Sequence, residues 1–95
     1  MSMQISGHGI EVTAALSDLI NKKFSRVKKH FDQITSAHII LNVHKTEQMA
    51  EATIHIPGHE IYAKADSDDM YKTIDLLMDK IIRQLDKYKA KHHSH

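Results

Sequence analysis

Lysine and arginine side chains recur at helical spacing toward the C-terminal end of the chain, at Lys80, Arg83, Lys87 and Lys91. An α-helix turns by about 100° per residue, so these four positions lie along one flank of a helix. Each ammonium or guanidinium group there could neutralise a phosphate and release condensed counterions. The spacing therefore indicates a surface for an extended polyanion.

A second row of cations occurs earlier in the sequence, where Lys22, Arg26 and Lys29 recur at i, i+4 and i+7 and Lys23 flanks them. An arginine in either row could hold a phosphate with two N–H groups. If the two helices lie side by side, we expect both rows to merge into one positive surface. The candidate RNA-binding residues are Lys22, Lys23, Arg26, Lys29, Lys80, Arg83, Lys87 and Lys91.

The C-terminal helix also has an acidic flank, which a protein–protein adaptor could use; it consists of Asp68, Asp75, Asp79 and Asp86. Lysines also commonly do no more than solubilise the exterior of a helix. Two cationic rows, with most carboxylates on another flank, favour RNA over either alternative. The tyrosines at positions 62, 71 and 88 form no evident platform for stacking bases. Structured RNA, recognised by shape and phosphates, therefore fits better than sequence-specific single strands.

Nine histidines raise the alternative of a metal-binding module. His38, His44, His55 and His59 fall on expected strands or a turn, and His44 and His55 could face each other across a hairpin. No carboxylate at characteristic spacing joins them, and the chain contains no cysteine. Serine and glycine motifs of nucleophilic enzymes are also missing from the sequence. We therefore expect no enzyme, no resident metal and no cofactor.

The elements that would position the cations follow from the periodicity of apolar residues. Alternating side chains predict a strand over Met3–His8 and three more over Ala37–Lys45, Ala50–Ile56 and Glu60–Ala65. Two helices are expected, one from its cap Thr13 to about His30 and one from Ser67 to about Lys91. The second has an apolar flank that should face the core, consisting of Met70, Ile74, Leu77, Met78, Ile81, Leu85 and Tyr88. Hairpin turns should lie near Thr46–Met49 and at Pro57-Gly58-His59, and Ser67 or Asp68 should cap the last helix.

The order β-α-β-β-β-α predicts an α+β fold of two layers. A right-handed crossover places the first helix on one face of the sheet, and the single apolar face should receive the second helix beside it. We expect a four-stranded sheet with both helices packed on one face. Residues 1–95 should form a single domain, with 92–95 as a disordered tail. No export signal or membrane-length apolar run occurs, so we expect a cytoplasmic protein.

Short motifs give the chain a family resemblance from about Gln4 to Lys91. The most specific segment consists of Asp69-Met70-Tyr71, Ile74-Asp75, Asp79-Lys80-Ile81 and Arg83-Gln84-Leu85. Supporting segments are Ile5-Ser6-Gly7, Glu11-Val12-Thr13 and Glu51-Ala52-Thr53-Ile54. With these motifs the sequence resembles the short hibernation promoting factors and the related ribosome-associated inhibitor proteins of bacteria.

The resemblance implies a β-α-β-β-β-α domain that binds the small ribosomal subunit and its 16S rRNA, in the channel used by mRNA and tRNA. Such a protein would inhibit translation in stationary phase. It would also promote inactive ribosome dimers, in functional association with ribosome modulation factor. The matching basic positions are Lys23, Arg26, Lys29, Lys80, Arg83 and Lys87. The long form's dimerisation domain and the inhibitor-type paralogue's longer tail have no counterpart in this sequence. The alternative is that paralogue's activity, which keeps idle ribosomes single.

Overall fold

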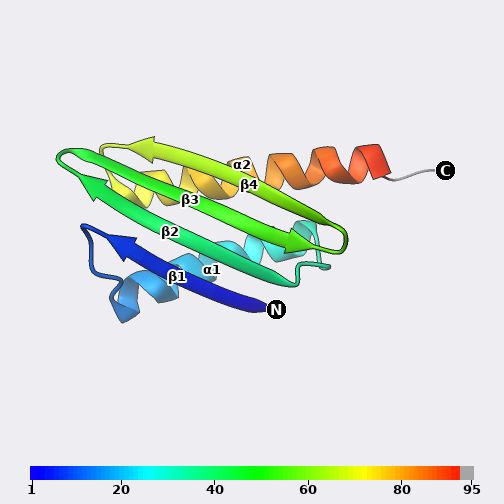
Figure 1. The fold of residues 1–95 in the computed structure, drawn as a ribbon, viewed down its shortest axis with the longest axis horizontal. Helices are drawn as coiled ribbons and strands as arrows, with labels where there is room; N and C mark the ends of the chain where they lie inside the picture. Colours follow the sequence, from blue (N-terminus) through cyan, green and yellow to red (C-terminus); the bar gives the residue numbers. More distant parts are fainter. Residues whose placement is uncertain (93–95) are drawn as a thin grey trace.

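The computed structural model describes residues 1–92 of the chain. Its elements are β1 (Ser2–His8), α1 (Ala14–His30), β2 (Ser36–His44), β3 (Glu47–Ile56), β4 (His59–Ser67) and α2 (Met70–His92). Figure 1 shows this order, which confirms the predicted β-α-β-β-β-α arrangement. His92 is the last residue of α2, and the rest of the predicted tail lies outside the described residues.

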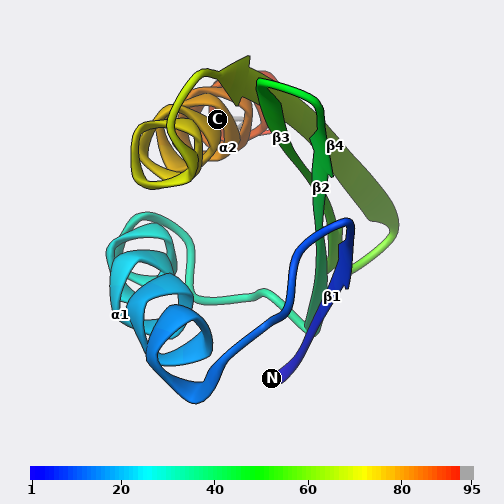
Figure 2. The ribbon, with the colours of Figure 1, turned by 90° about the vertical axis from the view of Figure 1, so that its left-hand side faces the viewer.

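The four strands form one mixed sheet in the order β1-β2-β3-β4. β1 pairs with β2 in parallel, while β2–β3 and β3–β4 are antiparallel. The parallel pair requires a crossover, which α1 provides. Both helices cover the same face of the sheet, as Figure 2 shows, so the predicted two-layer fold is confirmed.

The core lies between the sheet and the two helices. From the sheet, Ile39, Leu41 and Ile54 are fully buried, and four small alanines of β3 and β4 are buried beside them: Ala50, Ala52, Ala63 and Ala65. The predicted apolar flank of α2 packs over this surface, with Ile74, Leu77, Ile81 and Leu85 all at 0% exposure. Small residues on the strands leave room for large residues on the helix. This packing fixes the rotation of α2 about its axis, and with it the direction of every charged flank.

Helix α1 begins as predicted, because the Thr13 hydroxyl accepts a hydrogen bond from the Leu16 N–H at 3.2 Å. The predicted cap of α2 is wrong by one or two residues. Asp69 Oδ1 accepts from the Tyr71 N–H at 3.0 Å, so Asp69, rather than Ser67 or Asp68, caps the helix. Ser67 ends β4, and its Oγ lies 2.6 Å from the hydroxyl oxygen of the buried Thr73.

The turns also differ in part from expectation. The predicted loop at 46–49 is a two-residue turn, because β3 already begins at Glu47 and pairs it with His44. Lys45 in this turn has a φ of 58°, in the left-handed region. The second hairpin turn is Pro57-Gly58, and His59 belongs to β4. The first residues of β3 and β4 are polar, so the alternation of apolar side chains did not predict them. Backbone hydrogen bonds to the neighbouring strand, rather than buried side chains, make these residues part of the sheet.

Candidate nucleic-acid interface

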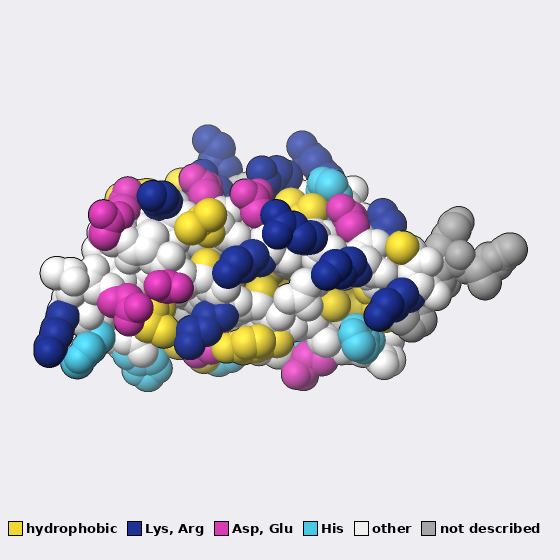
Figure 3. All heavy atoms as spheres, turned by 90° about the horizontal axis from the view of Figure 1, so that it is seen from above, with side chains coloured by type: hydrophobic (Ala, Val, Ile, Leu, Met, Phe, Trp, Pro, Cys, Tyr) yellow, Lys and Arg dark blue, Asp and Glu magenta, His cyan; other side chains and the backbone are white. Residues whose placement is uncertain are grey.

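Helices α1 and α2 lie side by side on the sheet and present their outer surfaces to solvent (Figure 2). Phe24, Val27 and Ile20 hold α1 on the core, which turns Lys22, Arg26 and Lys29 outward. All eight candidate cations are exposed except Lys23, which is half-buried. Figure 3 looks down on the side where α2 and β4 lie, and shows Lys and Arg side chains along most of its length.

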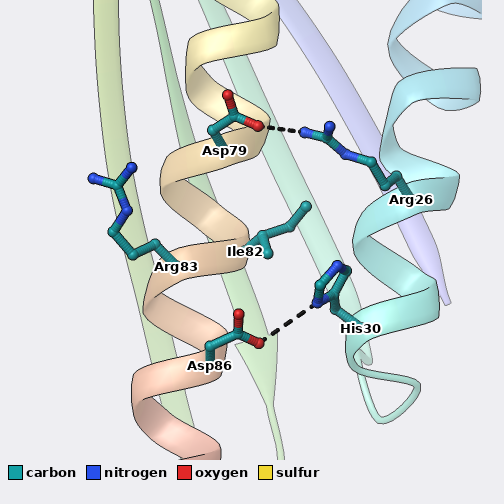
Figure 4. A pocket seen from close by; sticks show the side chains of 6 residues that line it. All are labelled: Arg26, His30, Asp79, Ile82, Arg83 and Asp86. Atoms are coloured by element: carbon teal, nitrogen blue, oxygen red, sulfur yellow. Dashed lines mark hydrogen bonds and ion pairs between the residues drawn. The ribbon is translucent and has the colours of Figure 1, made fainter.

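A series of ion pairs joins the facing flanks of the two helices. Lys23 Nζ lies 2.6 Å from Asp75 Oδ1, and an Arg26 guanidinium nitrogen lies 2.6 Å from Asp79 Oδ1. One turn further on, His30 Nδ1 lies 3.5 Å from Asp86 Oδ1, an ion pair when the imidazole is protonated. Figure 4 shows Arg26 and His30 reaching from α1 toward these carboxylates. We call this set of pairs the interhelical seam.

The seam corrects the expectation that the two cationic rows merge. The acidic flank of α2 faces α1, so carboxylates lie between the rows and pair with two of the four α1 candidates. The reason is geometric, because the apolar flank of α2 must face the sheet and this places its aspartates toward the neighbouring helix. Exposed pairs of this kind stabilise a fold by about 0–1 kcal/mol each and exchange readily with other ions.

The same geometry bears on the adaptor alternative, although the side chains of Asp75, Asp79 and Asp86 remain more than half exposed. Asp75, Asp79 and Asp86 face α1 within the molecule, and Asp68 lies before the first residue of α2. Three of the four aspartates of the predicted acidic flank are thus paired within the molecule, and a protein partner would have to compete with Lys23, Arg26 and His30 for them.

The cations of the α2 row have two environments: Lys80 contacts the edge strand of the sheet, whereas Arg83, Lys87 and Lys91 face solvent. Lys80 Nζ donates to the Lys64 carbonyl oxygen at 2.7 Å, and the Gln84 amide donates to the Tyr62 carbonyl oxygen. These two side chains cover backbone acceptors on β4, an edge strand that would otherwise be open to pairing. Arg83 projects away from α1 (Figure 4). Within residues 1–92, no ion pair engages the remaining candidates, which are Lys22, Lys29, Arg83, Lys87 and Lys91.

Three shallow hollows lie along this surface. One of about 320 Å³ is lined by residues of the seam together with Arg83, and one of about 290 Å³ by residues that include Lys22 and Lys23. The third, of about 430 Å³, lies near the end of α2 and is lined by residues that include Lys87 and Lys91. Each of the three is lined by at least two candidate cations, so a bound chain of phosphates would meet positive charge repeatedly along the helices.

Sequence reasoning missed two groups at this surface. Lys89 Nζ donates to the His30 carbonyl oxygen at 2.9 Å and links the ends of the two helices. The rings of His59 and Tyr88 stack with centroids 4.9 Å apart and planes inclined by 20°. Neither contact has a local signal, because each joins residues that lie far apart in the sequence.

The proposed histidine pair does not form. His44 pairs with Glu47 near one end of the sheet, whereas His55 pairs with Ser36 and Glu60 near the other. His55 Nδ1 lies 3.5 Å from Glu60 Oε1. No group of three or more possible metal ligands occurs within residues 1–92. In the same part of the chain, no helix has the length and hydropathy needed to cross a membrane.

Comparison with known proteins gives matches over nearly the whole chain. A family model described as Sigma 54 modulation protein / S30EA ribosomal protein matches residues 3–93. A ribosome hibernation promoting factor of Azotobacter vinelandii is 50% identical over 91 residues, which are 96% of this chain and 85% of that protein. A ribosome hibernation promoting factor of Escherichia coli (strain K12) is 40% identical over the full length of both chains.

Two solved structures share the fold. A ribosomal subunit interface protein from Coxiella burnetii has a TM-score of 0.89 and 44% identity, with 95% of this chain and 99% of that chain covered. The N-terminal domain of Thermus thermophilus Protein Y has a TM-score of 0.84 at 24% identity, covering 93% of this chain and 99% of that one. The first similarity includes the sequence, whereas the second concerns the fold.

Proposed function

Because the chain belongs to the Sigma 54 modulation protein / S30EA ribosomal protein family, we propose that it is a ribosome hibernation factor. It binds the small ribosomal subunit through the outer surface of α1 and α2 and contacts 16S rRNA there. Relatives at up to 50% identity are named ribosome hibernation promoting factors, and a 44% identical structure is named a ribosomal subunit interface protein. These names support the ribosome as the partner.

The observation that carries the proposed surface is the set of exposed, unpaired cations on both helices. Arg83, Lys87 and Lys91 on α2, with Lys22 and Lys29 on α1, face solvent without a carboxylate partner within residues 1–92. A formal net charge of +1 gives the whole protein little attraction for RNA. Local clustering creates the positive field instead. Lys23 and Arg26 join the surface when phosphates replace their aspartate partners.

The bound protein occupies the channel used by mRNA and tRNA, and it thereby inhibits translation in stationary phase. It further promotes inactive ribosome dimers together with ribosome modulation factor. Binding needs no chemical step and no cofactor, because complementarity of charge and shape to folded RNA suffices. A gradient profile of stationary-phase ribosomes with and without the protein tests the role in dimer formation. Loss of the dimer peak in its absence is expected, and an increased dimer peak would instead assign the activity that keeps idle ribosomes single.

The central test is cosedimentation with small ribosomal subunits. Arg83→Glu with Lys87→Glu should reduce binding at least about a hundredfold, because two phosphate contacts become repulsions. These positions are chosen over Lys80, whose contact with β4 would mix a structural effect into the result.

Lys45→Glu with Lys64→Glu is the matched control, since it makes the same change in charge at exposed lysines outside both helices. It should retain most of the binding, and circular dichroism should show both double variants folded. Equal loss in the two double variants would mean that total charge, not this surface, determines binding. Unchanged cosedimentation of the Arg83/Lys87 variant would refute the proposed surface.

A further inference from the structure

Three aromatic rings from separate parts of the chain meet near the C-terminal end of α2. His59 is the first residue of β4, Tyr88 lies in the last turns of α2, and Phe31 follows α1 as its C-terminal cap. The rings of His59 and Tyr88 are stacked, and Phe31 meets Tyr88 edge-on with centroids 6.1 Å apart and planes at 75°. Tyr88 is half-buried and held from two sides, whereas His59 is exposed. The result is a flat aromatic surface in which the contacts of Tyr88 with Phe31 and His59 hold the Tyr88 ring in place.

This aromatic surface borders the hollow of about 430 Å³, which is lined by His59, Ile61, Gln84, Lys87, Tyr88 and Lys91. Its size falls within the range of small-molecule sites, which begins at about 300 Å³. Lys87 and Lys91 stand one helical turn apart on its rim, about 6 Å along the axis of α2. The hollow thus combines aromatic rings, an isoleucine and two ammonium groups.

That combination matches the chemistry of a nucleotide. A nucleobase gains by stacking on an aromatic ring, and the phosphates on either side of it gain from neighbouring ammonium groups. An acidic peptide would use the two lysines but would leave the stacked rings without a role. A paired base could not reach the rings either, because its faces are covered by its neighbours in the duplex.

We propose that this hollow binds one unpaired nucleotide of an RNA strand, with its base on the His59–Tyr88 surface and its phosphates at Lys87 and Lys91. The inference rests on the proposed function and refines it, since both lysines belong to the α2 row. A strand that follows the row toward the end of α2 arrives at the hollow. Folded RNA is recognised along the helices through phosphates, and one unstacked nucleotide is recognised at their end.

The test uses a fluorescently labelled oligoadenylate of about ten nucleotides, a length within the usual site sizes for single strands, and measures its binding by anisotropy. His59→Ala should weaken binding about tenfold, the loss expected for one base–ring stack. His59→Tyr, which keeps a flat ring, should retain the binding. His55→Ala is the matched control, because it removes an exposed imidazole from the same hairpin outside the hollow.

Three results would overturn the inference: no oligoadenylate binding by the unsubstituted protein, equal affinities of the His59→Ala and unsubstituted proteins, or an equal loss with His55→Ala. Adenosine monophosphate serves as a second probe, followed by the ring proton resonances of His59 and Tyr88. It should bind far more weakly than the oligonucleotide, and equal affinity would assign the hollow to free nucleotides instead. A duplex RNA of the same length should be insensitive to His59→Ala.

The outcome is separable from that of the proposed function, because the oligonucleotide assay contains no ribosomes. If His59→Ala leaves oligoadenylate binding unchanged while the protein still cosediments with small subunits, only the nucleotide site is rejected. If oligoadenylate binding depends on His59 but the protein does not cosediment with small subunits, only the assignment of the ribosome as the partner is rejected.

Discussion

At the scale of single residues, the clearest electrostatic effect lies on the sheet face that the helices leave open. Tyr62 of β4 donates its hydroxyl hydrogen bond to Glu51 Oε2 of β3, a diagonal neighbour two residues from Thr53, which is its partner in the ladder. The hydrogen bond to Glu51 raises the pKa of Tyr62 above its usual value of 10.0, with desolvation and repulsion from the Glu51 charge acting in the same direction. A tyrosinate would lose the hydrogen bond and face a carboxylate. The pair therefore favours the neutral phenol.

Glu51→Gln should lower the pKa of Tyr62 toward its usual value, because the charge of the acceptor is gone. A spectrophotometric titration of tyrosinate absorbance measures the pKa of Tyr62, and the same titration of a Tyr62→Phe variant identifies the contribution of this tyrosine. Since the folded-state pKa is the raised one, the contribution of this group to the free energy of unfolding is complete below about pH 10 and declines as the pH rises through the folded-state pKa. An unchanged titration curve in Glu51→Gln would contradict the assigned cause.

At the scale of elements, the start of α2 is where the chain passes from the edge of the sheet to the interface. Asp69 caps the helix through the Tyr71 N–H, and the buried Thr73 hydroxyl donates to the Gln48 carbonyl oxygen of β3 at 2.9 Å. These contacts fix where α2 starts and how it sits on the sheet. The position of Arg83, nearly four helical turns further on, depends on them.

Asp69→Ala should lower the free energy of unfolding by about 1 kcal/mol, the usual contribution of a side-chain N-cap. Asp68→Ala is the matched control, because it removes the same charge one residue earlier without removing the bond to the Tyr71 N–H. Urea denaturation followed by circular dichroism measures both. A loss in Asp68→Ala as large as that in Asp69→Ala would show that charge near the helix dipole, rather than the cap, is responsible.

At the scale of the whole molecule, the domain is elongated, with extents of 48 × 22 × 19 Å, and α2 runs along much of its length (Figure 1). The interhelical seam follows this direction between the two cationic rows. Its aspartates hold α1 and α2 in register, yet they also repel phosphates from the centre of the surface. If the helices bind RNA as proposed, we therefore expect the seam to lower the affinity while it contributes modestly to stability.

Asp75→Asn with Asp79→Asn should strengthen small-subunit binding by roughly threefold or more, because Lys23 and Arg26 become available to phosphates. The log–log salt dependence of binding should steepen by about one unit for each additional phosphate that the protein neutralises. Cosedimentation at several salt concentrations measures both effects. Glu11→Gln with Glu47→Gln makes the same change in charge at exposed residues outside both helices and should leave the salt dependence nearly unchanged. Weaker binding by the Asp75/Asp79 variant would show that the seam orders the interface rather than screening it.

The sequence was sufficient for the elements, because local periodicity and capping chemistry are properties of neighbouring residues. Alternation predicted four strands, and the apolar flank of α2 predicted all of its buried apolar residues, although Tyr88 is only half-buried and the buried Thr73 was not foreseen. The Thr13 cap was also predictable. The short motifs around Tyr71 and Arg83 indicated the family.

Tertiary structure alone decided which charged flank of α2 faces α1, since that depends on how the helix is rotated over the alanines of β3 and β4. A helical projection shows that the rows of Lys80 and Asp79 are separate, but it contains no neighbouring helix against which to place them. For the same reason only the fold brings His59 beside Tyr88, two residues from different elements whose contact no local pattern records.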